Sequence, residues 1–438
     1  MSDNNKVVWT TKKVEEVAKK LDEGVIFRHH WEMPFFDKTI GLRKSNLAFR
    51  FTDHELQEYA KCASDVTYFA NNYCFIKSED GSFKTMRLRD YQYDILDLYN
   101  NNKLSILMAS RQVGKTICAS IYILHYMLFN NTKNVLLAAN IADTAQEVLD
   151  KIKTIYGYLP FFLQQGIEIW NVKQIKFQNG TRAKAFSMTK NASIGNAGDL
   201  VYIDEFAHID NTLANNFYKS IFPTLASIEN SKMIITSTPN GFNLFYQLLT
   251  DAERESTDPM KNNFTPLRVY WYQVPGRNVT YFKLVEHLLP QYGLDLDMIY
   301  EQCVAKYNPE DKVTKNFLPL VQLKPDPTSG KKVIHIQNSK KITYEDLREF
   351  QLLNKNGEYV NITRIAEVST WKLDAIKDIG GIDNFNQEYD LRFASGAKSI
   401  LSEETLERLT EHKKKFHNIG EIDSFKRLKW DYSDLKFI

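Results

Sequence analysis

The stretch LSILMASRQVGKT, residues 104–116, decides the fold. Its first five residues form an apolar run that predicts a short buried strand, and residues 117–124 predict a largely buried helix. A strand, a turn with Gly-Lys-Thr and a helix are the context of a phosphate-binding loop, whose backbone amides hold anionic oxygen at a helix N-terminus. Lys115 is predicted to reach the terminal phosphates, and the Thr116 hydroxyl to bind magnesium. Ala109 stands where the full pattern has its first Gly, so a chance Gly-Lys-Thr is the alternative.

A second predicted strand brings two carboxylates to the same region. Residues 200–203 are apolar and are followed by Asp204 and Glu205. Because ligands bind at the carboxyl ends of strands in open α/β sheets, these side chains suit a nucleotide site. Asp204 suits the second coordination shell of a magnesium ion, and Glu205 suits the general base for a water that attacks the γ-phosphate. A strand followed by an acidic helix cap is the alternative.

Hydroxyls and an amide add to this pattern. Residues 232–241, KMIITSTPNG, predict a buried strand that ends in hydroxyls and a turn. Such hydroxyls, on Thr236, Ser237 and Thr238, can sense a γ-phosphate and relay its loss, whereas a plain strand and turn is the alternative. Upstream of the loop, Gln92 has an amide that both donates and accepts hydrogen bonds, which suits an adenine edge. A surface Gln at a helix start is its alternative.

The composition sets broad limits. The chain has 438 residues, of which 43% are hydrophobic and 25% charged, and this length predicts two to three domains. The net charge of +2 does not argue for nucleic acid, so a DNA-binding surface would have to be a local basic patch. No N-terminal signal peptide and no membrane-spanning run is expected. The cysteines lack metal-ligand spacing and predict buried, reduced thiols of a cytosolic protein: Cys62, Cys74, Cys118 and Cys303.

The rest of the chain predicts further regular elements. These are helices over 14–21 and 143–158 (the second capped by Thr144), a strand over 135–139, a hairpin of 167–177 and 181–186 around Asn179-Gly180, a loop over 190–199 and a charged helix over 401–415.

Taken together, these motifs resemble the large terminase subunit of tailed bacteriophages, the ATPase that packages DNA into an empty capsid. The resemblance covers roughly residues 65–280 and 370–410. It rests on LRDYQ at 88–92, SRQVGKT at 110–116, VYIDEFA at 201–207 and TSTPNG at 236–241, with support from VPGR at 274–277 and FNQEY at 385–389. The family tolerates the missing first Gly of the loop.

The resemblance implies a fold and a set of roles. The fold is α/β, a P-loop NTPase of the additional-strand class with a mostly parallel central sheet flanked by helices. Glu205 would be the catalytic base, Asp204 and Thr116 would bind Mg²⁺, and Arg111 would stabilise charge on the transferred phosphate unless a ring neighbour supplies that arginine. A planar, permanently charged donor fork suits this task. The implied nucleotide-binding residues are Gln92, Ser110, Arg111, Gln112, Val113, Gly114, Lys115 and Thr116, and the implied coupling residues are Thr236, Ser237 and Thr238.

The resemblance also implies partners and a location. ATP and Mg²⁺ would be bound, and hydrolysis would translocate double-stranded DNA. The partners would be the procapsid portal, a small terminase subunit and further copies of the chain in a pentameric ring, with a monomer in isolation as the alternative. The location would be the host cell cytoplasm, with transient docking on the procapsid and absence from the mature virion.

Two departures from the family pattern divide the chain further. Residues 1–60 are expected to form an N-terminal segment, 61–277 the ATPase core, 278–369 an inserted subdomain and 370–438 the end of the ATPase region with a linker helix and tail. Within the insert, residues 324–332 are turn- and Lys-rich, and 333–336 predict a strand. The residues after 396 do not fit the family's nuclease domain, so we expect ATP hydrolysis without DNA cleavage. The nuclease would then be cut off, lost or carried by a separate chain.

Two other functions fit parts of the pattern. A DNA helicase or remodelling ATPase would share Tyr91-Gln92 and Asp204-Glu205, but no second set of helicase motifs follows residue 250. A nucleotide-binding or capsid-docking module without enzymatic activity would not need intact Lys115, Asp204 and Glu205. An ATPase half of a split terminase remains a further alternative.

Overall fold

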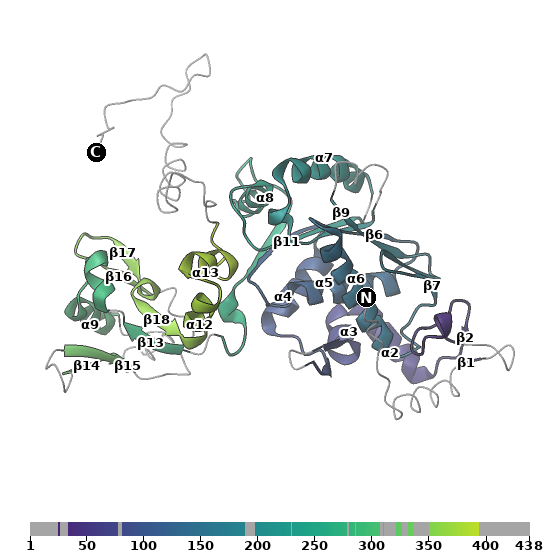
Figure 1. Ribbon diagram of the computed structural model, residues 1–438, viewed down its shortest axis with the longest axis horizontal. Coiled ribbons are helices and arrows are strands. Elements are labelled where there is room, and N and C mark those ends of the chain that lie inside the picture. Colours follow the sequence, from purple (N-terminus) through teal and green to yellow (C-terminus); the bar gives the residue numbers. More distant parts are fainter. Residues whose placement is uncertain are drawn as a thin grey trace, which may run out of the picture.

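The structure, a computed structural model, describes residues 25–26, 34–77, 81–188, 198–228, 230–277, 280–284, 286–306, 310, 321–325, 332–336 and 350–393. Its centre is an eight-stranded sheet with the order β12-β5-β11-β10-β6-β9-β8-β7 (Figure 1). Neighbours from β12 to β9 pair in parallel, whereas β8 and β7 pair antiparallel at one edge. The predicted mostly parallel sheet is therefore confirmed. The strands are β5 Leu104–Ala109, β6 Asn134–Ala139, β7 Ile167–Trp170, β8 Gln174–Phe177, β9 Arg182–Ser187, β10 Leu200–Ile203, β11 Lys232–Ser237 and β12 Thr265–Val269.

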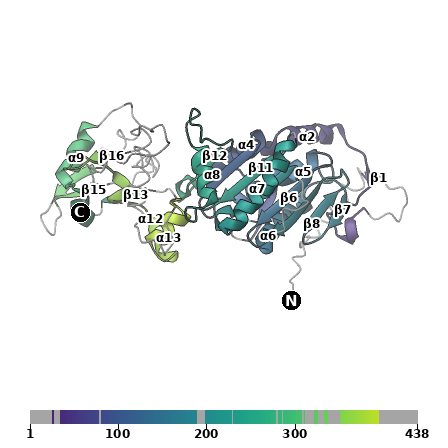
Figure 2. The ribbon, with the colours of Figure 1, turned by 90° about the horizontal axis from the view of Figure 1, so that it is seen from above.

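Helices cover both faces of this sheet (Figure 2). Side chains along β5 alternate between two cores: Leu107 and Ala109 join one, and Ile106 and Met108 join the other. Strands buried on both faces read as continuous apolar runs, which is why these strands could be predicted. The first core contains α2 Asp53–Ser64, α3 Val66–Tyr73, α4 Asp90–Asn101, α5 Lys115–Phe129 and α6 Ala142–Tyr158, and the second contains η2 Phe206–His208, α7 Asn211–Ser227 and α8 Leu244–Ala252.

The helix α5 is enclosed on nearly all sides. Every residue from Cys118 to Leu128 is buried, and α5 packs against α4, α6 and the sheet. A helix that is apolar all round is typical of the interior of a large domain. The predicted largely buried helix is confirmed, and Cys118 is a buried free thiol as expected.

Two local predictions were wrong. The predicted first arm of the hairpin, residues 167–177, is divided into β7 and β8, which pair with each other. The side chain of Asn171 accepts hydrogen bonds from the backbone N–H groups of Lys173 and Gln174, and this Asx turn reverses the chain without Gly or Pro. The helix α6 begins at Ala142 with Ile141 as its N-cap, so Thr144 lies inside the first turn rather than at the cap.

The strands predicted over 135–139, over 200–203 and within 232–241 are confirmed by β6, β10 and β11. Gln92 lies in the first turn of α4, and the turn at Asn179-Gly180 is confirmed between β8 and β9, where Gly180 has φ 81°. The predicted helices over 14–21 and 401–415, and most of the predicted loop over 190–199, lie outside the described residues.

A third core joins the later part of the chain to the end of β12. Trp271 is fully buried there, stacks on Trp371 with ring centroids 5.3 Å apart, and donates its indole N–H to Asp390. The strand predicted over 333–336 is confirmed by β15, whereas the predicted domain boundaries stay a prediction. The elements here are η3 Trp271–Gln273, β13 Thr280–Leu284, η4 Glu286–Tyr292, α9 Leu296–Ala305, β14 Val321–Pro325, β15 Lys332–Ile336, β16 Gln351–Leu353, β17 Tyr359–Asn361, η6 Ile362–Arg364, β18 Ala366–Ser369, α12 Thr370–Asp378 and α13 Ile382–Glu388.

A carboxylate ties α2 to α3. Glu58 accepts hydrogen bonds from Lys61 (2.8 Å), Tyr68 (2.7 Å) and Tyr73 (2.6 Å). The Lys61 bond, followed by the two phenol bonds, lowers the pKa of Glu58 to about 2. The ionised form is therefore the one that the fold stabilises.

We expect Glu58→Gln to lower the Tm at pH 7 by about 2–4 °C, because the amide keeps the shape but loses the charge-assisted bonds. Since the folded pKa lies below the ordinary value of 4.5, this contribution is present above pH 4.5 and is lost as the pH falls towards 2. Thermal unfolding of wild type and variant across that range measures it. Glu147→Gln on the exposed side of α6 is the control. A Tm difference that does not shrink in acid would contradict the assignment.

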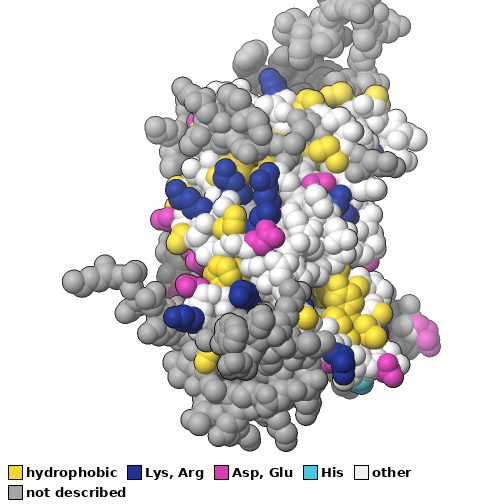
Figure 3. All heavy atoms as spheres, turned by 90° about the vertical axis from the view of Figure 1, so that its right-hand side faces the viewer, with side chains coloured by type: hydrophobic (Ala, Val, Ile, Leu, Met, Phe, Trp, Pro, Cys, Tyr) yellow, Lys and Arg dark blue, Asp and Glu magenta, His cyan; other side chains and the backbone are white. Residues whose placement is uncertain are grey.

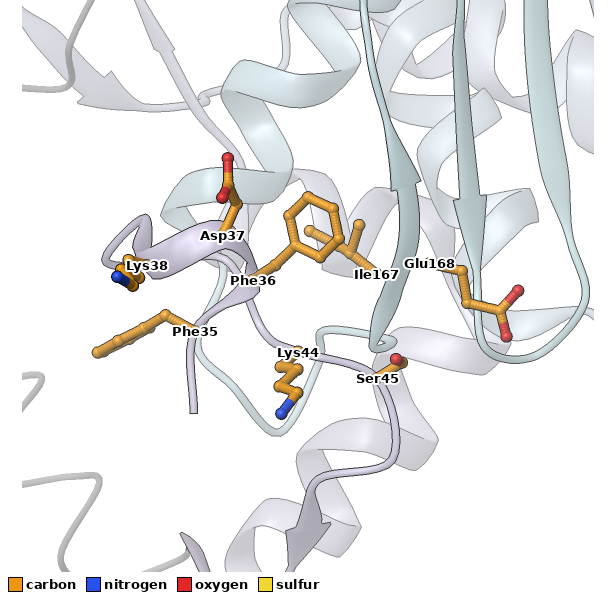
Figure 4. Close-up of a pocket in the computed structure, with 8 residues that line it drawn as sticks. All are labelled: Phe35, Phe36, Asp37, Lys38, Lys44, Ser45, Ile167 and Glu168. Atoms are coloured by element: carbon orange, nitrogen blue, oxygen red, sulfur yellow. The ribbon is translucent and has the colours of Figure 1, made fainter. Parts of the chain in front are cut away.

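An open pocket of about 500 Å³ lies beside β7 (Figure 4). It is lined by Phe35, Phe36, Asp37, Lys38, Lys44, Ser45, Ile167 and Glu168. Ile167 pairs with Phe177 on β8, and the neighbouring Lys176 pairs with Arg182 on β9. Arg182 in turn pairs with Asn134, the first residue of β6, so Ile167 lies near the N-terminal end of the parallel strands. The pocket therefore lies at the N-terminal ends of the parallel strands, whereas the phosphate-binding loop lies at their C-terminal ends. In the described part of the chain, no helix is long and apolar enough to cross a membrane.

Candidate nucleotide site

The loop between β5 and α5 has the backbone of an anion cradle. Gly114 has φ 87° and caps α5, and Gln112 is also left-handed with φ 59°. A Cβ on Gly114 would lie 2.8 Å from Nε2 of Gln92. Both the positive φ and this close approach require glycine. The loop amides and the α5 N-terminus together favour bound anionic oxygen.

Residues from α4 form hydrogen bonds to the phosphate-binding loop. Gln92 is buried; its Oε1 accepts from the Arg89 backbone N–H (3.0 Å), and its Nε2 donates to the Val113 carbonyl (3.2 Å). The Tyr91 hydroxyl donates to the same carbonyl (3.0 Å). In this structure Gln92 thus holds the phosphate-binding loop. The adenine contact predicted for Gln92 stays a prediction.

The three strand tips predicted to meet do meet. Lys115 Nζ donates to Asp204 Oδ1 (3.2 Å) and to Glu205 Oε1, and the Lys115 side chain is almost fully buried. Burial alone lowers the pKa of Lys115, but the two carboxylates outweigh it and the net pKa is raised. Lys115 is therefore a cation held between two acidic groups, at the start of α5.

Asp204 is the most enclosed acid of the site. Its Oδ1 accepts from Thr236 Oγ1 (2.8 Å) and from the Glu205 backbone N–H (3.0 Å), and its Oδ2 lies 3.5 Å from Thr116 Oγ1. A carboxylate and a hydroxyl are the hard oxygen donors that Mg²⁺ prefers. Asp204 and Thr116 therefore fit the predicted magnesium site.

The tips of β10 and β11 are joined by successive contacts. Thr236 donates to Asp204, and Ser237 Oγ accepts from the Ala207 backbone N–H (3.0 Å). The backbone N–H of Thr238 donates to Glu205 Oε2 (3.4 Å). Thr236 and Thr238 therefore contact the predicted metal and base residues directly, whereas Ser237 contacts the backbone of Ala207 just after them.

Glu205 sits in an unusual backbone conformation. Its φ of 50° and ψ of 44° are left-handed, which costs a non-glycine residue on the order of 1–3 kcal/mol. Such strain is held where the surroundings over-determine it, and it often marks a functional residue. His208 follows in η2, and its Nε2 lies 2.9 Å from Thr238 Oγ1 and 3.8 Å from Glu205 Oε2.

The hydrogen bonds of the Arg111 guanidinium go to Glu388 rather than to Asp204 or Glu205. Its Nε and Nη2 bind the Glu388 carboxylate at 2.6 and 3.1 Å, and its pKa is raised, chiefly by this contact. Ser110 Oγ donates to the Tyr389 carbonyl. Arg277 donates to the Arg111 and Gln112 carbonyls and lies over the Trp371 ring, 4.5 Å from its centroid. The loop is thus held by Arg277, which follows β12 and η3 in the chain, and by Glu388 and Tyr389 at the end of α13.

Sequence reasoning missed Arg277, Glu388 and His208 as site residues. The first two lie in VPGR and FNQEY, segments that carried the resemblance but to which no role was given. His208 follows Glu205 by one short helical turn, and that spacing could have identified it. The described residues contain no group of three or more His, Cys, Asp or Glu side chains that could hold a metal by themselves.

Comparison with known proteins gives a family and several solved structures. The large terminase of bacteriophage HK97 is 20% identical, with a TM-score of 0.41, over 50% of this chain and 46% of that one. The ATPase domain of the Thermus phage P74-26 large terminase is 17% identical, with a TM-score of 0.32, over 51% and 95%. A large terminase from a thermophilic bacteriophage, solved in complex with ATP-gamma-S, is 15% identical, with a TM-score of 0.33, over 47% and 49%.

The match spans less than half the length of the HK97 protein, and these structural similarities are too weak to carry an argument. The family described as terminase large subunit, T4likevirus-type, N-terminal, matches residues 106–348, from β5 to beyond β15. This range takes in the phosphate-binding loop, both carboxylates and the coupling residues. Because it is more than half of the chain, we conclude that the chain belongs to this family of terminase large subunits.

Proposed function

We propose that the chain hydrolyses ATP and that hydrolysis drives double-stranded DNA into a viral procapsid. The single observation that carries the ATPase proposal is the convergence of Lys115, Asp204 and Glu205 at the first turn of α5. Family membership supports the packaging role.

The residues have distinct tasks in this proposal. The amides of 112–114 and the Lys115 ammonium bind the phosphates, in place of the carboxylates that Lys115 contacts in this structure. Glu205 Oε1 is then released to accept a proton from the attacking water. Thr116 and Asp204 would hold magnesium, which would supply positive charge to the phosphates. Thr236 and Thr238, which contact Asp204 and Glu205, are positioned to respond when the γ-phosphate is lost.

The proposal is tested with the purified chain. We expect Mg²⁺-dependent ATP hydrolysis, stimulated by duplex DNA and reduced by at least about 100-fold in Lys115→Ala, which loses the cation that faces the phosphates. Phosphate release against ATP concentration measures it. Lys377→Ala, on the exposed face of α12, is the control. Hydrolysis that is unchanged in Lys115→Ala would contradict the site.

The structure suggests where DNA would be contacted. On β8 and β9, Ile175, Phe177 and Ala183 are buried, and the alternate side chains point away from that core. In the antiparallel register of β8 and β9, Lys176 lies opposite Arg182. Both Arg182 and Lys184 are exposed. Figure 3 shows several Lys and Arg side chains gathered on the side of the molecule at β7. Such a local basic surface suits the phosphate backbone of a duplex.

We expect the double variant Arg182→Ala, Lys184→Ala to weaken duplex binding and to reduce the slope of log K against log salt by about 2, because each substitution removes one cation that neutralises a phosphate. Fluorescence anisotropy with a labelled duplex at several salt concentrations measures it. The matched control is Lys355→Ala, Lys377→Ala, which removes the same charge elsewhere. An unchanged slope would exclude this surface as the DNA contact.

The remaining assignments are part of the same proposal, and family membership supports a place in the DNA-packaging machinery. The partners are the procapsid portal, a small terminase subunit and other copies of this chain in a ring, pentameric on the capsid. The location is the host cytoplasm with transient docking on the procapsid. The expectation that this chain does not cut DNA stays a prediction.

A further inference from the structure

The two carboxylate oxygens of Glu205 have different surroundings. Oε1 binds Lys115, at the position where phosphates are proposed to enter. Oε2 instead lies near the Thr238 backbone N–H (3.4 Å) and His208 Nε2 (3.8 Å). One oxygen therefore meets a partner that the nucleotide would remove, and the other meets partners that belong to the protein framework.

His208 is fixed relative to Glu205 from both its backbone and its side chain. Its backbone N–H donates to the Glu205 carbonyl (3.0 Å), which closes the single turn of η2. Its Nε2 lies 2.9 Å from Thr238 Oγ1 at the tip of β11. Because Nε2 faces a hydroxyl oxygen and a carboxylate oxygen, a proton on Nε2 makes both interactions favourable, whereas a bare nitrogen would oppose the carboxylate.

We infer that His208 is a positioning residue that, with Thr238, holds Oε2 of the catalytic base so that Oε1 is aimed at the attacking water. The inference rests on the proposed ATPase function. Once Lys115 turns to the phosphates, Glu205 no longer has its closest partner. Within the described part of the chain, the hydrogen bond and the close ion-pair contact that remain to its carboxylate are those from Thr238 and His208.

The backbone of Glu205 makes this support necessary. The left-handed conformation alone does not fix the side-chain torsions, and the Glu205 side chain is 31% exposed. A base that must lie within hydrogen-bond reach of a water loses rate steeply when it is displaced by about 1 Å. His208 also contacts the side chain of Thr238, so the imidazole adds a second connection between the base and the end of β11 to the direct one from the Thr238 backbone N–H.

The test compares His208→Leu, which removes the polar interactions, with His208→Gln, whose amide nitrogen reaches a position near Nε2. We expect His208→Leu to lower kcat by about tenfold or more with the KM for ATP within about twofold, and His208→Gln to recover most of kcat. The control is His54→Leu on the exposed side of α2, which we expect to match wild type. Thermal unfolding checks that each variant is folded.

A second measurement tests the His208–Thr238 interaction itself. Thr238→Val keeps the shape but removes the hydroxyl, and we expect its effect on kcat to be much smaller in the His208→Leu background than alone, because both act through one interaction. Equal kcat in His208→Leu and wild type, or equal losses in the Leu and Gln variants, would overturn the inference. Effects of the two substitutions that simply multiply would overturn it as well. Absence of hydrolysis in wild type would instead refute the proposed function.

Discussion

Glu205→Gln is expected to bind ATP but to lose turnover, with kcat reduced by at least about 100-fold. The amide has the size of the carboxylate and can still accept from the Thr238 backbone N–H, so the site keeps its shape. It cannot take a proton from water, and general base catalysis of this kind contributes about 100- to 10,000-fold. Lys115 keeps its hydrogen bond to Asp204 and stays available to phosphate.

Two measurements separate binding from chemistry in this variant. Equilibrium titration with a fluorescent ATP analogue should give an affinity within a few-fold of wild type, and single-turnover hydrolysis should show the loss. Glu255→Gln, on an exposed turn after α8, is the matched control. Normal hydrolysis by Glu205→Gln would show that another group is the base.

Arg111→Ala is expected to lower kcat by about 1,000-fold, the effect of losing an arginine that stabilises charge on a transferred phosphate. Arg111→Lys should not restore activity, since a point charge lacks the planar donor fork. In this structure the guanidinium binds Glu388, so it must leave that carboxylate to contact a phosphate. The Arg111 side chain is 55% exposed but that of Glu388 is only 13% exposed, so the variant leaves a partly enclosed carboxylate without its bidentate partner and should unfold at a slightly lower temperature than wild type.

A mixing experiment distinguishes an arginine that acts within its own subunit from one that acts on a neighbour. Arg111→Ala and Glu205→Gln chains are combined on procapsids and assayed for hydrolysis. If Arg111 acts in its own subunit, every site lacks one of the two groups and activity stays low. If it acts across the ring, some sites combine an intact Glu205 with an intact Arg111, and activity partly returns. Wild-type rates in Arg111→Ala alone would exclude both roles.

The centre of the fold could be predicted because its signals are local. The residues before and after the phosphate-binding loop are apolar without interruption, as strands and helices buried on all sides must be. Since parallel strands end at one edge, the polar residues after β5, β10 and β11 had to lie close together, and they do. The Asp204–Thr236 pair could therefore be anticipated as a proximity, although not as a hydrogen bond.

The parts that could not be predicted depend on distant segments or on side-chain detail. The Arg111–Glu388 pair joins residues 277 positions apart, and no periodicity connects them. The break between β7 and β8 depends on one Asn171 side chain that folds back on its own backbone. The support that Gln92 gives to the loop could not be predicted, because the sequence could not show that its amide donates to the Val113 carbonyl and lies close to Gly114.

The burial of α5 also limits how the molecule can do mechanical work. A helix surrounded by close-packed side chains along Cys118–Leu128 cannot slide or rotate without opening voids. α5 is therefore expected to keep its position within the core. In the proposed function, a displacement driven by ATP hydrolysis would have to come from segments that are packed less tightly than α5.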